Sequence, residues 1–533
     1  MIKRIFSPYI CVLMILFAVS IRAEEHSHEL AGGAIKCGTP DLLSLMQNSL
    51  NSTNSIAKIQ QRTIMDNSEV SSLNHFRVHY DTTGVHAINT LDEDGNNIPD
   101  YVDSTLIFLE YAWDLQIKQL GYPEPVGDNG RAGGDEIDIY LKQFGNLYGQ
   151  TYPEPLTGTT ATSYIEIEND FSESVFQSKG YDALKVTTAH EFFHVVQFSM
   201  YNNWDLLWWM EQTAVWMEDR TWDDVNDYIA YLHLFFNNSQ TPLDSNTGDF
   251  KYGAAIWVHY LVKQFGDTII LDLWNGLKNE KSSSIVTFDN ILPYGLANAF
   301  AEFAVWNYFT KDRANTVDFY SDSDLFTVDI ETDISASKSP ASDTLSTKKL
   351  TSRYVELLFS DVWDENDTLH VKVRPLDNGL YENTLIFFNS PDDYEIVSID
   401  LNGTDVTIDK DWSKAILVTS CVNTLNDTYS YDFDTRILDA GIVDQQYAFS
   451  VSATYPNPFN SLTTISFTLS EPGTISVKAY DILGKKVADI FYGNLDAGEK
   501  QILWKPSELS GGVYFIEMTS PWGRKVLKTM FLK

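Results

Sequence analysis

Cysteine is scarce in this chain. Three cysteines stand among 533 residues, and one of them, Cys11, lies in an apolar N-terminal segment. The two remaining thiols are too few for a disulfide framework, which excludes the class of small secreted domains held together by several disulfides. An apolar fraction of 44% and an aromatic fraction of 13% suffice for packed cores, and the length predicts several domains.

Basic residues are also few. Lysine and arginine number 37 against 74 aspartates and glutamates, which gives a formal net charge of −37. A surface of this sign repels nucleic acid and anionic membranes, and no basic cluster offsets it. The composition therefore predicts no nucleic-acid partner, and it favours solubility and the binding of cations.

Long hydrophobic runs are missing beyond the N-terminus. The chain opens with Lys3 and Arg4, continues with an apolar run over 10–19 and reaches a small residue at Ala23. This order predicts a secretory signal peptide over 1–23, with an N-terminal anchor helix as the alternative. No later stretch approaches the roughly 20 consecutive apolar residues of a spanning helix, so no membrane span is expected in the mature protein.

The rest of the chain divides into regions that differ in composition and in the spacing of their apolar residues. Residues 24–73 are polar and predict a pro-segment or N-terminal extension. Over 74–315, alternating segments such as HFRVHYDTTG and TSYIEIEND come first and segments of helical spacing follow, which predicts an α+β domain. Short alternating runs between Asp, Asn and Gly predict a β-sandwich over 320–440, and further strands are expected over 450–533.

The stretch TTAHEFFHVVQFSM carries two histidines four residues apart. If it is helical, it places His190 and His194 on one face, where both imidazoles can bind one zinc ion. In the H-E-x-x-H arrangement, Glu191 reaches the zinc-bound water and takes its proton. The alternative is a buried helix whose histidines find their partners within the protein.

A zinc ion held by two histidines needs a third ligand. Glu211 follows His194 by seventeen residues in the aromatic segment LLWWMEQTAVWMED, where a buried carboxylate is costly unless it is paired or binds a metal. Glu211 is predicted as the ligand. Glu218 or Asp219 is the second choice, or a partner that orients a histidine. The alternative for Glu211 is a solvated helix residue.

Hydrolysis through a tetrahedral intermediate also needs a hydrogen-bond donor to the oxyanion. Tyr252 and His259 lie in the segment FKYGAAIWVHYLVKQFG after the ligands, and either is a candidate for this role. The alternative is that both residues pack helices together.

These motifs resemble a known family. HEFFH followed by WMEQTAVWMED resembles the gluzincin metallopeptidases, and the block from RVHYDTTG to YGAAIWVHYL is similar to a group of bacterial secreted metalloproteases. The resemblance implies His190, His194 and Glu211 as zinc ligands, Glu191 as base and acid, and a zincin-like α+β metallopeptidase domain. We therefore expect a secreted zinc peptidase that hydrolyses protein or peptide substrates. The alternative is a catalytically inactive, adhesive surface-binding protein whose metal is structural.

The twelve-residue segment DEDGNNIPDYVD carries oxygen atoms at alternating positions. Ligands at positions 1, 3, 5, 7, 9 and 12 of such a loop suit calcium, and here these positions are Asp92, Asp94, Asn96, Ile98, Asp100 and Asp103. The placement of the glycine and the final aspartate depart from the EF-hand pattern. The segment predicts a calcium site or, as the alternative, a solvated acidic turn.

The stretch IKCGTPD lies between the signal peptide and the peptidase segment. It resembles the cysteine switch of metalloprotease pro-segments, which implies that the Cys37 thiolate fills the open position at the zinc. A disulfide from Cys37 to Cys421 is a second interpretation, and a thiol with neither role is a third.

The end of the chain carries several motifs in order. YPNPFN at 455–460, the YDILGKKV turn and the GGVYF strand resemble the C-terminal sorting domain of type IX (Por) secretion. The resemblance implies an immunoglobulin-like β-sandwich, the secretion machinery as a partner, and a secreted or cell-surface location. An ordinary adhesive sandwich domain is the alternative.

Overall fold

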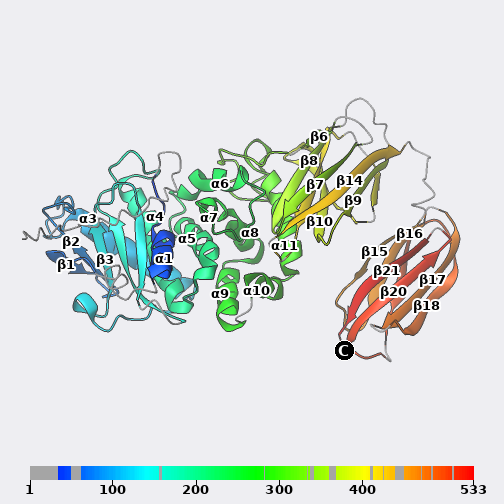
Figure 1. Ribbon diagram of the computed structural model, residues 1–533, viewed down its shortest axis with the longest axis horizontal. Coiled ribbons are helices and arrows are strands. Elements are labelled where there is room, and N and C mark those ends of the chain that lie inside the picture. Colours follow the sequence, from blue (N-terminus) through cyan, green and yellow to red (C-terminus); the bar gives the residue numbers. More distant parts are fainter. Residues whose placement is uncertain are drawn as a thin grey trace, which may run out of the picture.

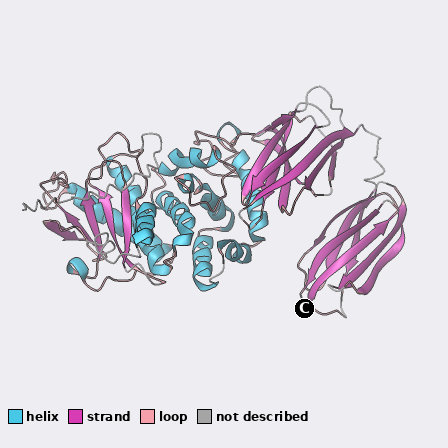
Figure 2. Ribbon diagram, viewed as in Figure 1, coloured by secondary structure: helices cyan, strands magenta, loops and turns pink. Residues whose placement is uncertain are grey.

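The structure, a computed structural model, describes most of the chain. It covers residues 34–49, 62–154, 159–280, 283–332, 334–336, 341–358, 368–401, 403–407, 412–423, 425, 427–438, 449–469, 471–481, 484–506, 509–521 and 523–532. The predicted signal peptide over 1–23 lies outside the described residues. A part that mixes helices with a sheet comes first (Figure 1), and two parts built from strands follow it along the chain (Figure 2). The expected multidomain α+β architecture is confirmed.

The first part is built on a five-stranded sheet with the order β1-β2-β3-β5-β4. β2, β3 and β5 are parallel neighbours, whereas β1 and β4 pair antiparallel at the two edges. Because β4 is an edge strand, one of its sides is available to another segment of chain. The strands are β1 (Asn67–Val70), β2 (Phe76–Tyr80), β3 (Ile137–Lys142), β4 (Gly149–Glu154) and β5 (Thr162–Glu168).

Helices pack against this sheet and extend beyond it. They are α1 (Thr39–Ser49), α3 (Asp100–Trp113), α4 (Gly180–Met200), α5 (Leu207–Thr221), α6 (Leu232–Phe236), α7 (Phe250–Gly253), α8 (Ile256–Phe265), α9 (Thr268–Glu280), α10 (Ser284–Ile291) and α11 (Gly295–Tyr308). α4 packs against β4, β5, α3 and α5, and its residues 186–200 are all buried. A helix segment buried on every side needs no solvent-exposed polar face.

Short helical turns connect these elements. A π-helical turn, η1 (Asp114–Gln119), continues α3, and the 3-10 turns are η2 (Arg131–Gly133), η3 (Trp204–Leu206), η4 (Asp227–Tyr231) and η5 (Lys311–Arg313). η3 and η4 flank α5, so this helix is held at both ends by short turns.

Part of the segment expected to be a separate N-terminal extension, 24–73, is built into this domain. β1 pairs with β2, and α1 places Leu42, Leu43 and Met46 in the same core as the sheet. The polar composition of the segment does not predict this packing, because only a few apolar side chains make the contacts. In the structure the domain therefore includes residues before position 74.

The middle part is a β-sandwich that docks on α11. The hydroxyl of Tyr354 donates to the carbonyl of Ala304 at 2.8 Å, and the rings of Phe388 and Tyr308 meet edge to face with centroids 5.5 Å apart. One hydrophobic core therefore runs from the sandwich into the helical domain. The two sheets have the orders β11-β10-β13-β8-β6 and β12-β9-β14-β7.

The strands of this sandwich match the alternating runs in the sequence. They are β6 (Ile334–Ala336), β7 (Ala341–Lys348), β8 (Thr351–Leu358), β9 (Thr368–Pro375), β10 (Tyr381–Ser390), β11 (Asp393–Ser398), β12 (Thr404–Thr407), β13 (Lys414–Cys421) and β14 (Thr428–Leu438). Apart from the short β6, which runs parallel to β8, the strand pairs are antiparallel.

The C-terminal part is a second sandwich with a hydrophobic core of its own, around Ile465, Val477 and Ile516. Its sheets have the orders β15-β16-β19 and β18-β17-β20-β21. The strands are β15 (Phe449–Tyr455), β16 (Thr463–Leu469), β17 (Gly473–Asp481), β18 (Lys486–Leu495), β19 (Gly498–Trp504), β20 (Gly512–Ser520) and β21 (Gly523–Phe531). Within the described part of the chain, no helix combines the length and the apolar character needed to cross a bilayer.

Candidate metal centre

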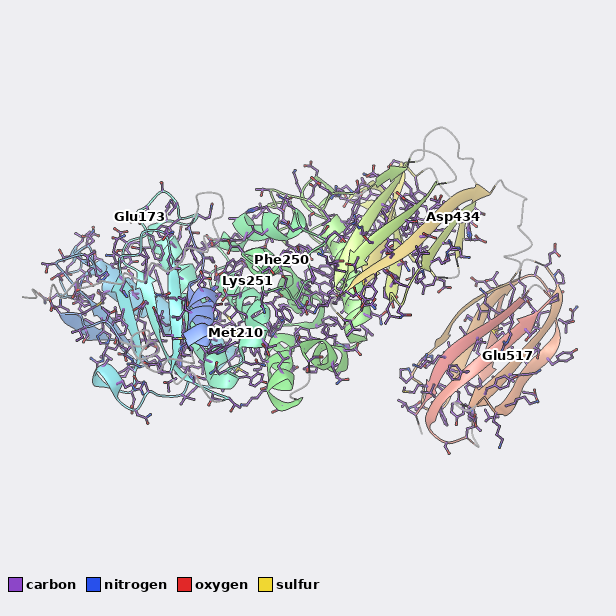
Figure 3. The ribbon with its side chains drawn as sticks, viewed as in Figure 1. Glu173, Met210, Phe250, Lys251, Asp434 and Glu517 are labelled. Carbon is purple, nitrogen blue, oxygen red and sulfur yellow. The ribbon has the colours of Figure 1, made fainter. Side chains whose placement is uncertain are left out.

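Two adjacent helices, α4 and α5, bring two imidazoles and a carboxylate together. Nε2 of His190 lies 3.4 Å from Oε2 of Glu211, and Nε2 of His194 lies 3.3 Å from Oε1 of the same carboxylate. The two imidazole centroids are 4.7 Å apart, because residues four apart on a helix share one face. Figure 3 labels Met210, the neighbour of Glu211 in α5, in the helical region next to the sheet.

The outer nitrogens of both imidazoles are held by other side chains. Nδ1 of His190 lies 2.6 Å from Oε1 of Glu218, and Nδ1 of His194 lies 2.8 Å from Oε1 of Gln197. The Gln197 amide is itself fixed, since it donates to the carbonyl of Met210 at 3.0 Å. Partners of this kind set the tautomer and orientation of metal-binding histidines, and here they direct both Nε2 atoms toward Glu211.

The inner atoms of the cluster lack hydrogen bonds. Nε2 of His190 and both carboxylate oxygens of Glu211 are buried and have no hydrogen-bond partner among the described residues. Buried polar atoms are rarely left in this state, because losing their water costs free energy that only a new partner returns. Two imidazole nitrogens and a carboxylate oxygen are ligands that zinc prefers, so the residues present fit a zinc ion.

Charge at the cluster also favours a cation. Burial alone would raise the pKa of Glu211, but the imidazoles of His194 and His190 hold that pKa well below its usual value. Burial lowers the pKa of His190, yet Glu211 and Glu218 outweigh it and raise this pKa to about 10. The buried carboxylates thus favour positive charge at the place where the imidazoles meet Glu211, and a divalent cation would supply it.

Glu191 is buried beside the cluster with one oxygen held and one oxygen free. The hydroxyl of Thr151, in β4, donates to Oε2 of Glu191 at 2.7 Å, whereas Oε1 has no hydrogen-bond partner among the described residues. Burial raises the pKa of this carboxyl group, and the adjacent His190 opposes that rise. Gly149 lets β4 approach so closely, since a Cβ atom there would lie 3.0 Å from Cγ of Glu191.

A fourth donor comes from the N-terminal segment. Sγ of Cys37 lies 3.5 Å from Nε2 of His194, and one ligand atom from each of Cys37, His190, His194 and Glu211 lies within 4.8 Å of the others. Burial raises the pKa of the Cys37 thiol well above its usual value, and nearby carboxylates add to this effect. The disulfide interpretation is wrong for this structure, because Cys37 and Cys421 are both free thiols and Cys421 is buried in the sandwich core.

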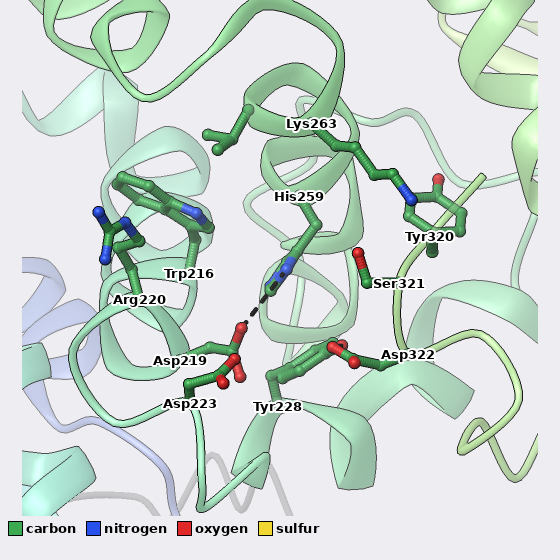
Figure 4. A pocket seen from close by; sticks show the side chains of 11 residues that line it. Trp216, Asp219, Arg220, Asp223, Tyr228, His259, Lys263, Tyr320, Ser321 and Asp322 are labelled. Carbon is green, nitrogen blue, oxygen red and sulfur yellow. Dashed lines mark hydrogen bonds and ion pairs between the residues drawn. The ribbon is translucent and has the colours of Figure 1, made fainter. Parts of the chain in front are cut away.

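The two predicted oxyanion donors lie in different places. The hydroxyl of Tyr252 donates to the carbonyl oxygen of Cys37 at 3.2 Å, which puts it next to the cluster. His259 instead lines a separate cavity of about 520 Å³ together with Asp219 and Tyr228 (Figure 4). The structure therefore brings Tyr252, and not His259, to the predicted metal ligands.

His259 and Asp219 form a neutral pair in this cavity. Nδ1 of His259 lies 3.8 Å from Oδ2 of Asp219, the contact drawn as a dashed line in Figure 4. Burial lowers the pKa of His259 to about 3. Burial, followed by the charges of Asp322, Asp223 and Glu218, raises the pKa of Asp219 to about 8. Both groups are mainly uncharged at pH 7, so despite its geometry the contact is not an ion pair.

The predicted calcium loop is folded around its own polar groups. The Asp92 carboxylate accepts the backbone N–H of Gly95 at 2.8 Å, and the side-chain amide of Asn96 donates to Asp103 at 2.5 Å. Among the described residues, the acidic side chains that converge within 4.8 Å are instead Glu168, Asp170 and Glu173. A calcium site at 92–103 stays a prediction.

Comparison with known proteins gives little for the first two parts of the chain. Among curated proteins, none matches it. Among solved structures, it is similar to a beta-1,2-glucanase from Parabacteroides distasonis, at 12% identity and a TM-score of 0.14 over 36% of this chain and 32% of that one. It is also similar to a GH2 beta-galacturonidase from Eisenbergiella tayi, at 11% identity and a TM-score of 0.16 over 35% of each chain. The chain spans about a third of the length of these proteins, and likeness at such scores carries no argument about its fold or chemistry.

The C-terminal sandwich has an assigned family. Residues 453–532 match the family described as the secretion system C-terminal sorting domain. The match covers the end of β15 and all of β16 to β21, so it coincides with the part that has its own hydrophobic core. The protein is therefore exported through the type IX system and is secreted or attached to the cell surface, with the secretion machinery as a partner. Its C-terminal domain belongs to the family of secretion system sorting domains.

Proposed function

We propose that the domain before the sandwiches is a zinc-dependent peptidase of the gluzincin type, with a zincin-like fold and with His190, His194 and Glu211 as the zinc ligands. The observation that carries this proposal is the meeting of two imidazole Nε2 atoms and one carboxylate, with Nε2 of His190 and both carboxylate oxygens left without hydrogen bonds. The ligand types, the helical spacing and the unmet need for a cation all agree with zinc.

The residues around the centre have the chemistry that peptide hydrolysis requires. His190, His194 and Glu211 would hold the zinc ion, which would supply Lewis acidity to polarise a substrate carbonyl and to lower the pKa of a water molecule toward about 7. Glu191 takes the water proton with its free Oε1 while Thr151 holds Oε2, and it then gives that proton to the leaving amine. The Tyr252 hydroxyl would stabilise the oxyanion once it no longer donates to the carbonyl oxygen of Cys37.

One observation favours the competing function, an inactive binding protein with a structural metal. Cys37 completes a set of four protein donors, and structural zinc sites are closed in this manner. The position of Glu191 favours the peptidase, since a structural site has no use for a buried carboxylate with an unpartnered oxygen beside the ligands. Burying such a group without a task costs stability.

The test measures zinc content and casein hydrolysis of the full-length protein, of Cys37→Ser and of the double variant Cys37→Ser/Glu191→Gln. We expect about one zinc per chain in all three, as a single centre requires. Casein hydrolysis should be highest in Cys37→Ser and should fall by about 10²–10⁴-fold in the double variant, the usual contribution of a general base. Zinc retained with no hydrolysis in any form supports the inactive binding protein, and absence of zinc contradicts the centre itself.

A further inference from the structure

We propose that the cavity around His259 is a binding site for an organic ammonium group, carried by a small free amine or by a lysine side chain. The site uses neither the proposed zinc ligands nor the N-terminal segment, so its test is independent of both. Four features carry the inference: the size of the cavity, its aromatic floor, its buried acceptor atoms without partners, and the engagement of its basic side chains elsewhere.

The cavity lies where four segments that are distant in the sequence meet (Figure 4). α5 contributes Trp216 and Asp219, η4 contributes Tyr228, α8 contributes His259, and the segment 320–322 lines the remaining side. Its volume of about 520 Å³ falls within the range of about 300–1,000 Å³ that small-molecule sites occupy. Packed protein interiors leave few voids larger than a water molecule, so a cavity of this size is a candidate ligand site.

The cavity has an exposed rim and a buried, aromatic floor. Asp223 and Ser321 line it and are exposed to solvent. Trp216, Tyr228 and Tyr320 line it as well, and each is at most 3% exposed. Aromatic rings attract a cation that lies over their faces, and they also cover an alkyl chain. A ligand can therefore enter from water and place a charged group among aromatic side chains.

Two polar atoms in the wall of the cavity are buried and lack hydrogen bonds. They are Nε2 of His259 and Oδ1 of Asp219, which have no partner among the described residues. Nδ1 of His259 faces Oδ2 of Asp219 at 3.8 Å. A ring proton on Nδ1 points at this carboxyl group and leaves Nε2 as an acceptor. Buried acceptors without a partner are costly, so both atoms are open to the donors of a ligand.

Negative charge gathers around these two atoms. Asp322 and Asp223 line the same cavity, and Glu218 is the neighbour of Asp219 in α5. Burial, followed by the charges of these three carboxylates, raises the pKa of Asp219 to about 8. A cation bound among them offsets their mutual repulsion. The cavity therefore selects a positively charged ligand and disfavours an anion.

The two basic side chains that line the cavity are engaged elsewhere. The Arg220 guanidinium donates to Oδ2 of Asp267 through two nitrogens, at 3.0 and 2.8 Å. The Lys263 ammonium donates to the carbonyl of Thr316 at 3.0 Å and to the carbonyl of Phe319. Among the described residues, neither base forms an ion pair with an acid of the cavity. The cavity therefore offers acceptors and charge for a cation that the protein itself does not supply.

An organic cation fits this cavity better than a metal ion. A metal ion holds its ligand atoms at about 2.0–2.6 Å, so the ligand atoms must converge. Among the described residues, the groups of three or more potential ligand atoms within 4.8 Å of one another lie at other places in the chain. A primary ammonium has three N–H donors that point to separate acceptors, so it needs no such convergence. The remaining volume accommodates an alkyl chain beside the aromatic rings.

Calorimetric titration of the full-length protein with pentylamine and with pentanol tests the site, because the two share a chain length and only the amine is charged. We expect one pentylamine per chain with a Kd of about 1 mM or tighter, and pentanol should bind at least about tenfold more weakly. Asp219→Asn should weaken pentylamine binding by at least about tenfold, since it removes a buried charge partner. Asp224→Asn is the matched control, because this carboxylate is exposed and pairs with Lys185.

Binding of the amine should also release a proton from Asp219. At pH 7 this carboxyl group is mainly protonated in the free protein, and an ammonium group beside it favours the ionised form. Burial holds His259 neutral and raises the pKa of Tyr228, so these two keep their protonation states. The titratable and charged groups around Asp219 are Glu218, Arg220 and Asp223 on α5, Tyr228 on η4, His259 and Lys263 on α8, and Asp322.

Titrations at pH 7 in two buffers with different ionisation heats measure this release. We expect about one proton per pentylamine bound to wild type, and none in Asp219→Asn. The affinity of wild type should rise with pH up to about 8, where Asp219 ionises without help. If Asp219→Asn does not fold, Asp322→Asn provides the comparison of affinities, because it removes another charge that lines the cavity.

The remaining outcomes decide the source of the ammonium group or overturn the site. Nα-acetyl-lysinamide bound as tightly as pentylamine indicates a lysine side chain as the ligand, and weaker binding indicates a free amine. Equal binding of pentylamine and pentanol, or no binding of pentylamine, overturns the site. Undiminished binding by the Asp219→Asn or Asp322→Asn variant overturns it too, and so does displacement of pentylamine by equimolar manganese(II). Zinc content and casein hydrolysis do not enter, so each outcome leaves the proposed peptidase function untouched.

Discussion

Nδ1 of His190 and Oε1 of Glu218 lie 2.6 Å apart, although 28 positions separate them in the chain. The second oxygen of Glu218 lies 2.7 Å from Nζ of Lys36. One buried carboxylate therefore joins the histidine of the proposed zinc centre to the N-terminal segment that covers it. Glu218 contacts both the proposed zinc centre and the N-terminal segment. A substitution at Glu218 should therefore alter both zinc binding and the docking of that segment.

Glu218→Gln should weaken zinc binding by about tenfold, at the lower end of the 10–100-fold loss typical for such supporting partners. The amide still accepts a hydrogen bond from Nδ1, but it no longer carries the charge that makes the imidazole a stronger ligand. Competition with a chromophoric chelator measures the affinity. Asp219→Asn, one residue along and facing a different cavity, is the control and should leave zinc affinity unchanged. Equal affinity of Glu218→Gln and wild type would contradict the role given to this contact.

Gly38→Ala should loosen the segment that carries Cys37. A Cβ atom at this position would lie 2.5 Å from Oε1 and 3.1 Å from Cβ of Gln150, in β4. Because the side chain of Gln150 must move, docking weakens, and we expect Cys37 to react with a thiol reagent about tenfold faster, the equivalent of 1.4 kcal/mol. Gly127→Ala is the control, since a Cβ there meets only Asp135 at 3.9 Å. Unchanged reactivity of Gly38→Ala would show that the segment adapts without loosening.

The parts of the centre that depend on local geometry could be predicted from the sequence. His190 and His194 share a helix face because of their spacing, and Glu211 stood out because a carboxylate among tryptophans needs a partner. The structure brings these three side chains together. The type IX sorting domain was recognised and is confirmed, since its motifs follow one another over a single short domain.

Contacts between distant parts of the chain could not be predicted from local sequence patterns. Cys37 meets a residue 157 positions away and Lys36 meets one 191 positions away, so the sequence leaves three interpretations of Cys37 open and gives no signal for the contacts of Lys36. A lysine in a polar segment is normally solvated. The edge strand β4 gave no strand signal either, because GQTYPE contains glycine and proline, which strands disfavour.

Asp219→Asn should stabilise the protein at high pH and have no effect at low pH. The unfolded carboxyl group titrates near a pKa of about 3.9, whereas burial and neighbouring carboxylates raise the folded pKa to about 8. Between these values the folded state binds more protons, so the stability of wild type falls as pH rises from about 4 to 8. Asparagine does not titrate, so the stability of the variant does not fall in this way as pH rises.

Thermal unfolding of Asp219→Asn and wild type from pH 4 to 9 measures the difference. The two should unfold at the same temperature near pH 4, and the variant should gain stability on the order of 1–3 kcal/mol by pH 8 and above. The control is Asp224→Asn, whose carboxylate is exposed. A gain that does not depend on pH would contradict the raised pKa of Asp219.

Removal of residues 449–533 should abolish export and leave the metal centre intact. The C-terminal sandwich has a hydrophobic core of its own, and its family carries the sorting signal. We expect the truncated chain to keep its zinc affinity and the unfolding temperature of the first domain, while it stays inside the producing cell. Fractionation and zinc titration measure the two effects. Loss of zinc binding on truncation would show that the domains depend on each other.

Thr151→Val should lower kcat by about 3–10-fold and leave KM nearly unchanged. The Thr151 hydroxyl donates to Oε2 of Glu191 at 2.7 Å, and a typical hydrogen bond contributes about 0.5–1.5 kcal/mol. Valine keeps the branched shape that suits a strand. It removes the donor that holds the proposed base Glu191, so we expect substrate binding to be spared and proton transfer to slow.

The comparison is made in the Cys37→Ser protein, which lacks the thiol beside the proposed zinc ligands. Thr151→Ser is the matched variant because it keeps the hydroxyl, and it should restore most of kcat. A purely structural role of Thr151 would lower thermal stability in both variants, since each alters the packing of β4 on α4. If valine and serine reduce kcat equally, the hydrogen bond does not position Glu191. Full activity of the valine variant would show that Glu191 does not need the Thr151 hydrogen bond to act as the base.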